Sequence, residues 1–167
     1  MNGWADYLEY LNHLSAAKLY NAGGYIRKFQ MNSGLDESMI SNWEITNKLE
    51  LPEDYRKFVK RWNGGSLFGL EMVPLEQSTY EREGILAIHN WGNGDFDGFE
   101  VHLDHKVGQI VFANHENGLT FPLTTSFYDW LRNVIEEMLK ERIIYHPMDY
   151  SISKPTYQGI YSHIPYD

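Results

Sequence analysis

The sequence predicts an α+β fold built as one domain, and three observations support this prediction. The 167-residue chain is long enough for one hydrophobic core and short for two. Apolar residues recur at helical spacing up to Trp62 and again after Thr125, whereas short segments rich in β-branched and aromatic residues lie between. We therefore expect a central antiparallel sheet packed against helices, with an extra N-terminal helix and an irregular Tyr- and Pro-rich C-terminal tail.

Two helices are predicted in the N-terminal part of the chain. In "WADYLEYLNHLSAAKLY", four apolar side chains share one helical face, and "NAGGY" ends the helix. These four are Trp4, Tyr7, Leu8 and Leu11. In "LDESMISNWEITNKL", Asp36 is placed to cap the N-terminus. The apolar residues of this second helix are Met39, Ile40 and Trp43.

A third helix is predicted in "LPEDYRKFVKRWNGG". Pro52 suits its first turn, and the run Asn63, Gly64 and Gly65 supplies a left-handed stop. Its apolar stripe consists of Tyr55, Phe58, Val59 and Trp62.

The middle of the chain predicts the strands of the sheet. The candidate strands are "SLFGLEMVPL", "GILAIHN", "GFEVHLD", "GQIVFAN" and "LTFPL". The segments "HKVG" and "HENG" resemble hairpin turns, so the last three strands should form a meander. Phe99, Val101 and Leu103 alternate with polar residues, which predicts that these three side chains are buried.

A last helix is predicted in "TSFYDWLRNVIEEMLKERI", where apolar residues repeat at three and four positions and include Trp130 and Leu131. Ser126 and Asp129 can cap its start, and Lys140 and Arg142 lie near its end. The following tail has no periodicity, so we expect an extended arm that packs on the domain or stays mobile. We divide the chain into an N-terminal helical extension (1–34), a main domain (35–143) and a C-terminal tail (144–167).

The composition excludes several classes of function. A formal net charge of −9 argues against nucleic acid as a partner, because phosphate binding needs an excess of Lys and Arg, and it favours a basic partner. Without cysteine, the chain has no disulfides, thiolate metal sites or cysteine nucleophile. With neither a leader-like N-terminus nor an apolar run of membrane-spanning length, a cytoplasmic protein with no membrane contact is expected.

The stretch "WGNGDFDGFEVHLD" resembles an EF-hand calcium loop when counted from Asn93. An EF-hand loop lies between two helices, whereas the residues after Asp97 alternate as a half-buried strand. Asp104, the twelfth position, would therefore lie roughly 20 Å from Gly98. We reject the EF-hand. Weak cation binding by Asn93, Asp95 and Asp97 remains an alternative to a plain solvated turn.

Other catalytic and metal-binding patterns are weak. A zinc site is suggested by four histidines, His89, His102, His105 and His115. His102 and Asp104 could supply two of its ligands, but the sequence identifies no third ligand. Ser66 and Ser126 lie outside a nucleophile elbow, and no Gly-rich loop precedes a helix to hold phosphate. We therefore predict a protein that is not an enzyme, with no catalytic residue, cofactor or metal. A metal-dependent enzyme remains a remote alternative.

Four motifs in order resemble the SUKH superfamily of Smi/Knr-type domains, over about Met39 to Leu139. In this family, an acidic residue precedes a Leu-Pro-x-x-Tyr helix that ends in Asn-Gly-Gly. A loop that contains Gly and Asp then leads into a strand. A hairpin strand ending near His and a Ser-Phe-x-x-Trp/Phe-Leu helix follow. The matching residues are Glu44, Leu51, Pro52, Tyr55, Asn63, Gly64, Gly65, Gly92 to Asp104, His115 and Ser126 to Leu131.

The resemblance implies a protein-binding function. SUKH domains are known mainly as immunity proteins of bacterial polymorphic toxin systems, and eukaryotic relatives act in cell-wall regulation. The expected function is to bind and neutralise a cognate protein toxin, a basic nuclease for which an acidic chain is the complement. The alternative is a regulatory or scaffold module of the Smi/Knr type.

We predict that the partner binds the acidic loop between the second and third predicted strands. It combines aromatic residues with carboxylates, and an aromatic anchor ringed by charge is the usual anatomy of a binding hot spot. The predicted partner-binding residues are Trp91, Asp95, Phe96, Asp97 and Glu100. In the alternative interpretation, both aromatic side chains fold inward and the acids are solvated turn residues.

Overall fold

The computed structural model describes residues 3–16, 19–20, 26–27, 29–78, 84–139 and 159–164. The helices are α1 (Trp4–Ala16), α2 (Glu37–Asn47), α3 (Glu53–Arg61) and α4 (Phe127–Leu139), with short 3-10 helices η1 (Leu75–Gln77) and η2 (Gly159–Tyr161). The strands are β1 (Leu19–Tyr20), β2 (Ile26–Arg27), β3 (Phe29–Ser33), β4 (Trp62–Leu67), β5 (Leu70–Met72), β6 (Ile85–Asn90), β7 (Phe96–Val101), β8 (Val107–Ala113) and β9 (Thr120–Thr124). The α+β prediction is confirmed.

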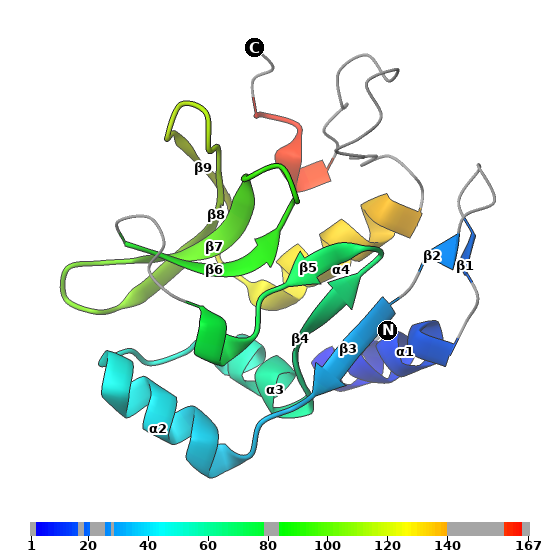
Figure 1. The fold of residues 1–167 in the computed structure, drawn as a ribbon, viewed down its shortest axis with the longest axis horizontal. Helices are drawn as coiled ribbons and strands as arrows, with labels where there is room; N and C mark the ends of the chain where they lie inside the picture. Colours follow the sequence, from blue (N-terminus) through cyan, green and yellow to red (C-terminus); the bar gives the residue numbers. More distant parts are fainter. Residues whose placement is uncertain are drawn as a thin grey trace.

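The central sheet has seven strands in the order β3-β4-β5-β6-β7-β8-β9, and each strand pairs antiparallel with the next (Figure 1). The predicted meander is confirmed, because β8 and β9 are joined by a turn over 115–117 in "HENG". Pro122 lies in β9, where it pairs with Val111. Proline is tolerated there because β9 is an edge strand.

Helices α1, α3 and α4 cover one face of the sheet and lie behind it in Figure 1. Aromatic side chains hold these layers together around Phe127 of α4. Its ring centroid lies 4.8 Å from Tyr55 and 5.0 Å from Phe58 of α3, and 5.4 Å from Trp130. The ring of Trp4 in α1 meets Phe127 edge-on at 6.2 Å. The main core therefore lies between the sheet and these three helices.

A second, smaller apolar cluster lies on the opposite face of the sheet. It consists of Ile85, Ala87, Phe96, Val111 and Ala113, and Val73 packs against it. Successive side chains of a strand point to opposite faces, so Phe96 joins this cluster while Phe99 faces the helices.

The predicted caps of α2 and α4 are confirmed. Asp36 Oδ1 accepts a hydrogen bond of 2.9 Å from the Met39 amide, and Ser126 Oγ accepts one of 3.2 Å from the Asp129 amide. Asp54 Oδ2 of α3 accepts a further bond of 3.0 Å from the Tyr128 amide. A side chain of α3 thus fixes the position of the α4 N-terminus.

The predicted end of α3 is wrong. The helix ends at Arg61, and Trp62, expected in its buried stripe, begins β4 and is only partly buried. The glycines are needed for close packing between strands. A Cβ at Gly64 would lie 2.7 Å from the Met72 carbonyl oxygen, and one at Gly65 would lie 2.5 Å from that of Gln30.

Two further details of the predicted strands are corrected. The segment "SLFGLEMVPL" forms the end of β4, a turn and β5, with φ of 54° at Phe68 and 97° at Gly69. Val101 and Leu103 were both predicted to be buried. Val101 is only partly buried, and Leu103 is fully exposed, because β7 ends at Val101 and the chain turns through residues 102–106. The His102 amide donates to the Lys106 carbonyl oxygen across this turn.

Segments near both ends of the chain join the main domain. β3, which lies in the predicted N-terminal extension, is an edge strand with Phe29 opposite Leu67. From the predicted tail, η2 returns to the core, where Tyr161 and Ile164 are buried. The predicted positions of Lys140 and Arg142 lie outside the described residues.

Candidate partner-binding site

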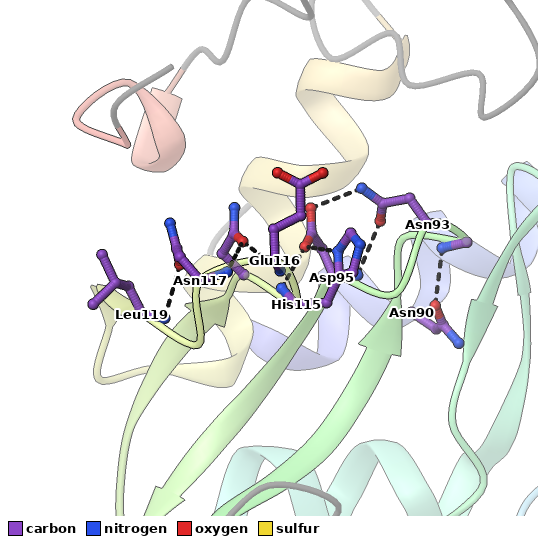
Figure 2. Close-up of polar contacts among 9 residues, drawn as sticks. Asn90, Asn93, Asp95, His115, Glu116, Asn117 and Leu119 are labelled. Atoms are coloured by element: carbon purple, nitrogen blue, oxygen red, sulfur yellow. Dashed lines mark hydrogen bonds and ion pairs between the residues drawn. The ribbon is translucent and has the colours of Figure 1, made fainter. Parts of the chain in front are cut away.

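Residues 90–95, from the last residue of β6 to the start of β7, and residues 114–119, between β8 and β9, meet at one end of the sheet. We call them the paired loops. Asp95 joins them, because its Oδ1 accepts a 2.8 Å hydrogen bond from the His115 amide and lies 2.8 Å from His115 Nδ1 (Figure 2). Its Oδ2 accepts a 2.7 Å bond from Asn93 Nδ2. One buried carboxylate therefore fixes the relative position of the two loops.

Each loop is also held by side-chain contacts to its own backbone. Asn114 Oδ1 accepts hydrogen bonds from the Glu116 amide at 2.8 Å and the Asn117 amide at 3.2 Å. In the other loop, the Asp95 amide donates to Asn93 Oδ1 at 3.0 Å. Such contacts restrain the backbone in the way an Asx turn does, so both loops keep a defined shape.

Four of the five predicted partner-binding residues are buried. Trp91, Asp95, Phe96 and Asp97 are each at most 6% exposed, whereas Glu100 is partly exposed. The Trp91 ring packs edge-on against His89 and the Phe96 ring lies in the second apolar cluster, so both aromatics fold inward and neither is presented as an anchor. These side chains support the loop from inside. Binding of a partner at this loop stays a prediction.

Asp97 has a structural role that the sequence did not indicate. It is fully buried, and its Oδ2 accepts hydrogen bonds from Tyr161 Oη at 2.6 Å and Trp130 Nε1 at 3.1 Å. His89 Nδ1 lies 3.6 Å from the same oxygen. The network links β6, β7, α4 and η2. Because Tyr161 lies far along the chain in a segment without periodicity, no local pattern could have revealed this contact.

Charge is distributed unevenly between the sheet and the helices before it. Ranges 62–78 and 84–124, which hold strands β4 to β9, contain seven acidic residues and a single basic one, Lys106. Range 36–61 contains six acidic and five basic residues. Several of these form ion pairs, such as Arg56 with Glu37 and with Glu44 at 3.3 Å. Two of the seven acidic residues, Asp95 and Asp97, are buried. Helices α1 and α4 are also acidic, with five acidic residues and one basic residue, so the strands are acidic relative to α2 and α3 rather than to all the helices.

A hollow of about 240 Å³ lies beside the paired loops, at the strands of the second apolar cluster. It is lined by Glu71, Val73, Gln77, Ala87, Asn90, Gly94 and Phe96. Asn90 and Gly94 belong to both the hollow and the paired loops. Gly94 is required there, because a Cβ would lie 2.9 Å from the His115 ring.

The candidate nucleophiles have structural contacts. Ser66 Oγ accepts a hydrogen bond from the Gly69 amide in the β4–β5 turn, and Ser126 caps α4. Among the described residues, no group of three or more His, Asp or Glu side chains is placed to hold a metal ion. No helix in the described ranges is both long and apolar enough to cross a membrane.

The motif residues ahead of the sheet also have identifiable contacts. Glu44 Oε1 accepts a 3.0 Å hydrogen bond from the Leu51 amide, which joins the end of α2 to the start of α3. Asn63 Oδ1 accepts a 2.8 Å bond from the Leu75 amide, and its Nδ2 donates to Glu76 at 2.6 Å. These residues hold the scaffold on which the paired loops are built.

The sheet, the helices on one of its faces and the loops joined at its end define a small α+β domain of the Smi/Knr class. The chain belongs to the SMI1/KNR4 family (SUKH-1), whose family model matches residues 34–133, more than half of its length. The resemblance drawn from the sequence motifs is thereby confirmed. No match was found among curated proteins.

Proposed function

We propose that this protein is an immunity protein that binds and neutralises a cognate, basic nuclease toxin of a bacterial polymorphic toxin system. Membership of the SUKH-1 family supports the proposal, because members of this superfamily are known mainly as immunity proteins that act by binding. The cytoplasm, where a nuclease meets its nucleic-acid substrate, is the proposed place of action.

The observation that carries the proposal is the excess of acidic over basic residues along the strands of the sheet. The strands β4 to β9 and the described segments between them hold five acidic residues that are not buried, against one basic residue, Lys106. A nuclease carries Lys and Arg to contact phosphates, so its substrate-binding surface is the natural complement of an acidic surface. Such complementarity speeds association and suppresses unsuitable partners.

The paired loops are the proposed centre of the contact. Residues 115–119 of the second loop are exposed, and Leu119 presents an apolar side chain that is 55% exposed. The contacts of Asp95 and Asn114 fix the loop shape before binding, which lowers the entropy lost on association. In this proposal the four buried residues of the predicted set act by supporting the loop, and Glu100 supplies negative charge nearby.

The proposal is tested by sequencing the genes beside this one and purifying the nuclease toxin domain that we expect one of them to encode. Its activity on DNA and RNA is measured with increasing amounts of the purified chain, together with size-exclusion chromatography of the mixture. We expect the activity to fall to background at about one equivalent, because immunity proteins bind their toxins tightly. A non-cognate basic nuclease is the control and should remain active, which separates specific neutralisation from simple charge attraction.

The proposal would be contradicted if no neighbouring gene encodes a toxin, or if the encoded toxin forms no complex with this chain. A complex that forms but leaves nuclease activity unchanged would instead favour a regulatory or scaffold module of the Smi/Knr type.

A further inference from the structure

We propose that the hollow beside the paired loops binds an arginine side chain of the basic protein partner. This inference rests on the proposed protein-binding function and identifies the group that the surface takes. The lining of the hollow combines an exposed carboxylate with buried and half-buried apolar side chains, and a guanidinium on an aliphatic stem matches both features.

Glu71 supplies the carboxylate. It is exposed on β5 opposite Asn90 of β6, and Asn90 Nδ2 donates to its Oε2 at 3.4 Å, a long bond. No Lys or Arg among the described side chains forms an ion pair with Glu71, whereas Glu37 and Glu53 on the helical side have such partners. An ionised carboxylate has about four acceptor positions, so Glu71 retains capacity for a bidentate partner.

Three of the residues that line the hollow have apolar side chains. Ala87 and Phe96 are buried in the second apolar cluster, and Val73 is half-buried against them. An arginine side chain commonly lays its methylene stem along such a surface while its charged head remains at the rim. Arginine is also enriched at protein interfaces, whereas lysine is depleted there.

The surrounding polar groups favour a donor-rich cation. Asn90 and Gln77 add amide oxygens to the lining, and Asn90 Oδ1 already accepts a 2.9 Å bond from the Gly92 amide, which holds its side chain in place. Arginine presents five N–H donors in a planar fork and accepts none. The hollow also lies in the acidic part of the domain, where an anionic ligand would be repelled.

The test uses the full chain and two small probes, N-acetyl-arginine amide and N-acetyl-citrulline amide, which have nearly the same shape and differ in charge. Each probe is titrated to about 20 mM into ¹⁵N-labelled protein, which would nearly fill a site of millimolar affinity. The arginine probe should shift the amide signals of Glu71, Asn90 and Gly94, and the citrulline probe should not.

Glu71→Gln is the test variant and Glu50→Gln is the matched control, because Glu50 is an exposed acid in the α2–α3 connection. We expect the Kd for the arginine probe to rise at least about tenfold in Glu71→Gln and to stay unchanged in Glu50→Gln. Equal melting temperatures of the variants would show that the fold is intact.

Three results would overturn the inference: no signal shift with the arginine probe, equal shifts with both probes, or an unchanged Kd in Glu71→Gln. The titration needs no toxin, so it fails or succeeds independently of the proposed function. If Glu71→Gln neutralises the cognate nuclease with unchanged affinity, the arginine site is wrong while the immunity function stands. If the probe binds but no nuclease does, the immunity function is wrong instead.

Discussion

The Tyr161 hydroxyl donates a 2.6 Å hydrogen bond to the Asp97 carboxylate, although 64 positions separate the two residues in the chain. Both side chains are fully buried. Among the described residues, the other oxygen of Asp97, Oδ1, has no hydrogen-bond partner, so Oδ2 makes all the hydrogen bonds of this buried carboxyl group there. The C-terminal segment 159–164 is therefore part of the domain core.

Tyr161→Phe should lower the free energy of unfolding by about 1 to 3 kcal/mol, because it removes a donor from a buried acceptor. The matched control is Tyr7→Phe. Tyr7 is equally buried, but its hydroxyl has no hydrogen-bond partner in the described structure, so removing it should leave stability unchanged or raise it. Denaturant unfolding of both variants measures the difference, and equal losses would show that the Tyr161 contact contributes nothing.

Trp130→Ala should cost about 3 to 5 kcal/mol, because it removes a fully buried ring packed against Phe127 and leaves a cavity. Leu103→Ala should change stability by less than about 0.5 kcal/mol, because Leu103 is exposed in a turn. A chemical denaturation series checks both. A large loss of stability in Leu103→Ala would show that Leu103 is buried in the core, as the sequence alone predicted.

The sequence predicted the helices well, because amphipathic periodicity and capping residues are local signals. Asp36 and Ser126 cap α2 and α4 as expected. The sequence prediction failed where one local pattern of residues is typical of two different structures. Asn63, Gly64 and Gly65 have the composition of a helix stop, yet the glycines lie within β4 because neighbouring backbones approach closely. Likewise, apolar and polar residues alternate up to Leu103, although strand β7 already ends at Val101.

The sequence predicted that the candidate loop joins two strands but not which contacts hold it, and binding of a partner there stays a prediction. The sequence selected the loop between β6 and β7, but it could not show that His115 lies beside Asp95, because strand pairing brings them together. Trp91 and Asp97 are buried by contacts with Tyr161 from the distant C-terminal segment. An aromatic residue outside a periodic pattern therefore does not indicate exposure when a remote segment covers it.

Asp95→Ala should release the paired loops from one another. The His115 amide would lose its acceptor, so its hydrogen exchange should become at least about tenfold faster, with a stability loss of about 1 to 3 kcal/mol. Asp104→Ala is the control, because Asp104 is an exposed acid paired with Lys106 and should leave that exchange unchanged. Unchanged exchange in Asp95→Ala would show that Asp95 does not fix the loops.

Calcium and zinc should leave the melting temperature of the metal-free protein unchanged. A site that binds only the folded state raises stability in proportion to the logarithm of ligand excess. The EF-hand alternative fails because the loop lies between strands β6 and β7, and His115 Nδ1 contacts Asp95 instead. Thermal unfolding with each metal checks this, and a rise of several degrees at submillimolar metal would restore the weak cation site at Asn93.

The central claim is that the sheet side of the domain, which is the side of strands β4 to β9 and their loops, binds a basic toxin. Association kinetics with the cognate nuclease domain test this claim most directly. Glu100→Gln combined with Glu116→Gln removes two charges from the sheet side, whereas Glu50→Gln combined with Asp129→Asn removes the same charge from the helical side. At low salt, the sheet-side variant should associate about 3- to 10-fold more slowly, and this difference should shrink near 0.15 M salt, where the Debye length is about 8 Å. The helical-side variant should associate at nearly the rate of the unmodified chain. Equal slowing in both variants, or none in either, would contradict the claim.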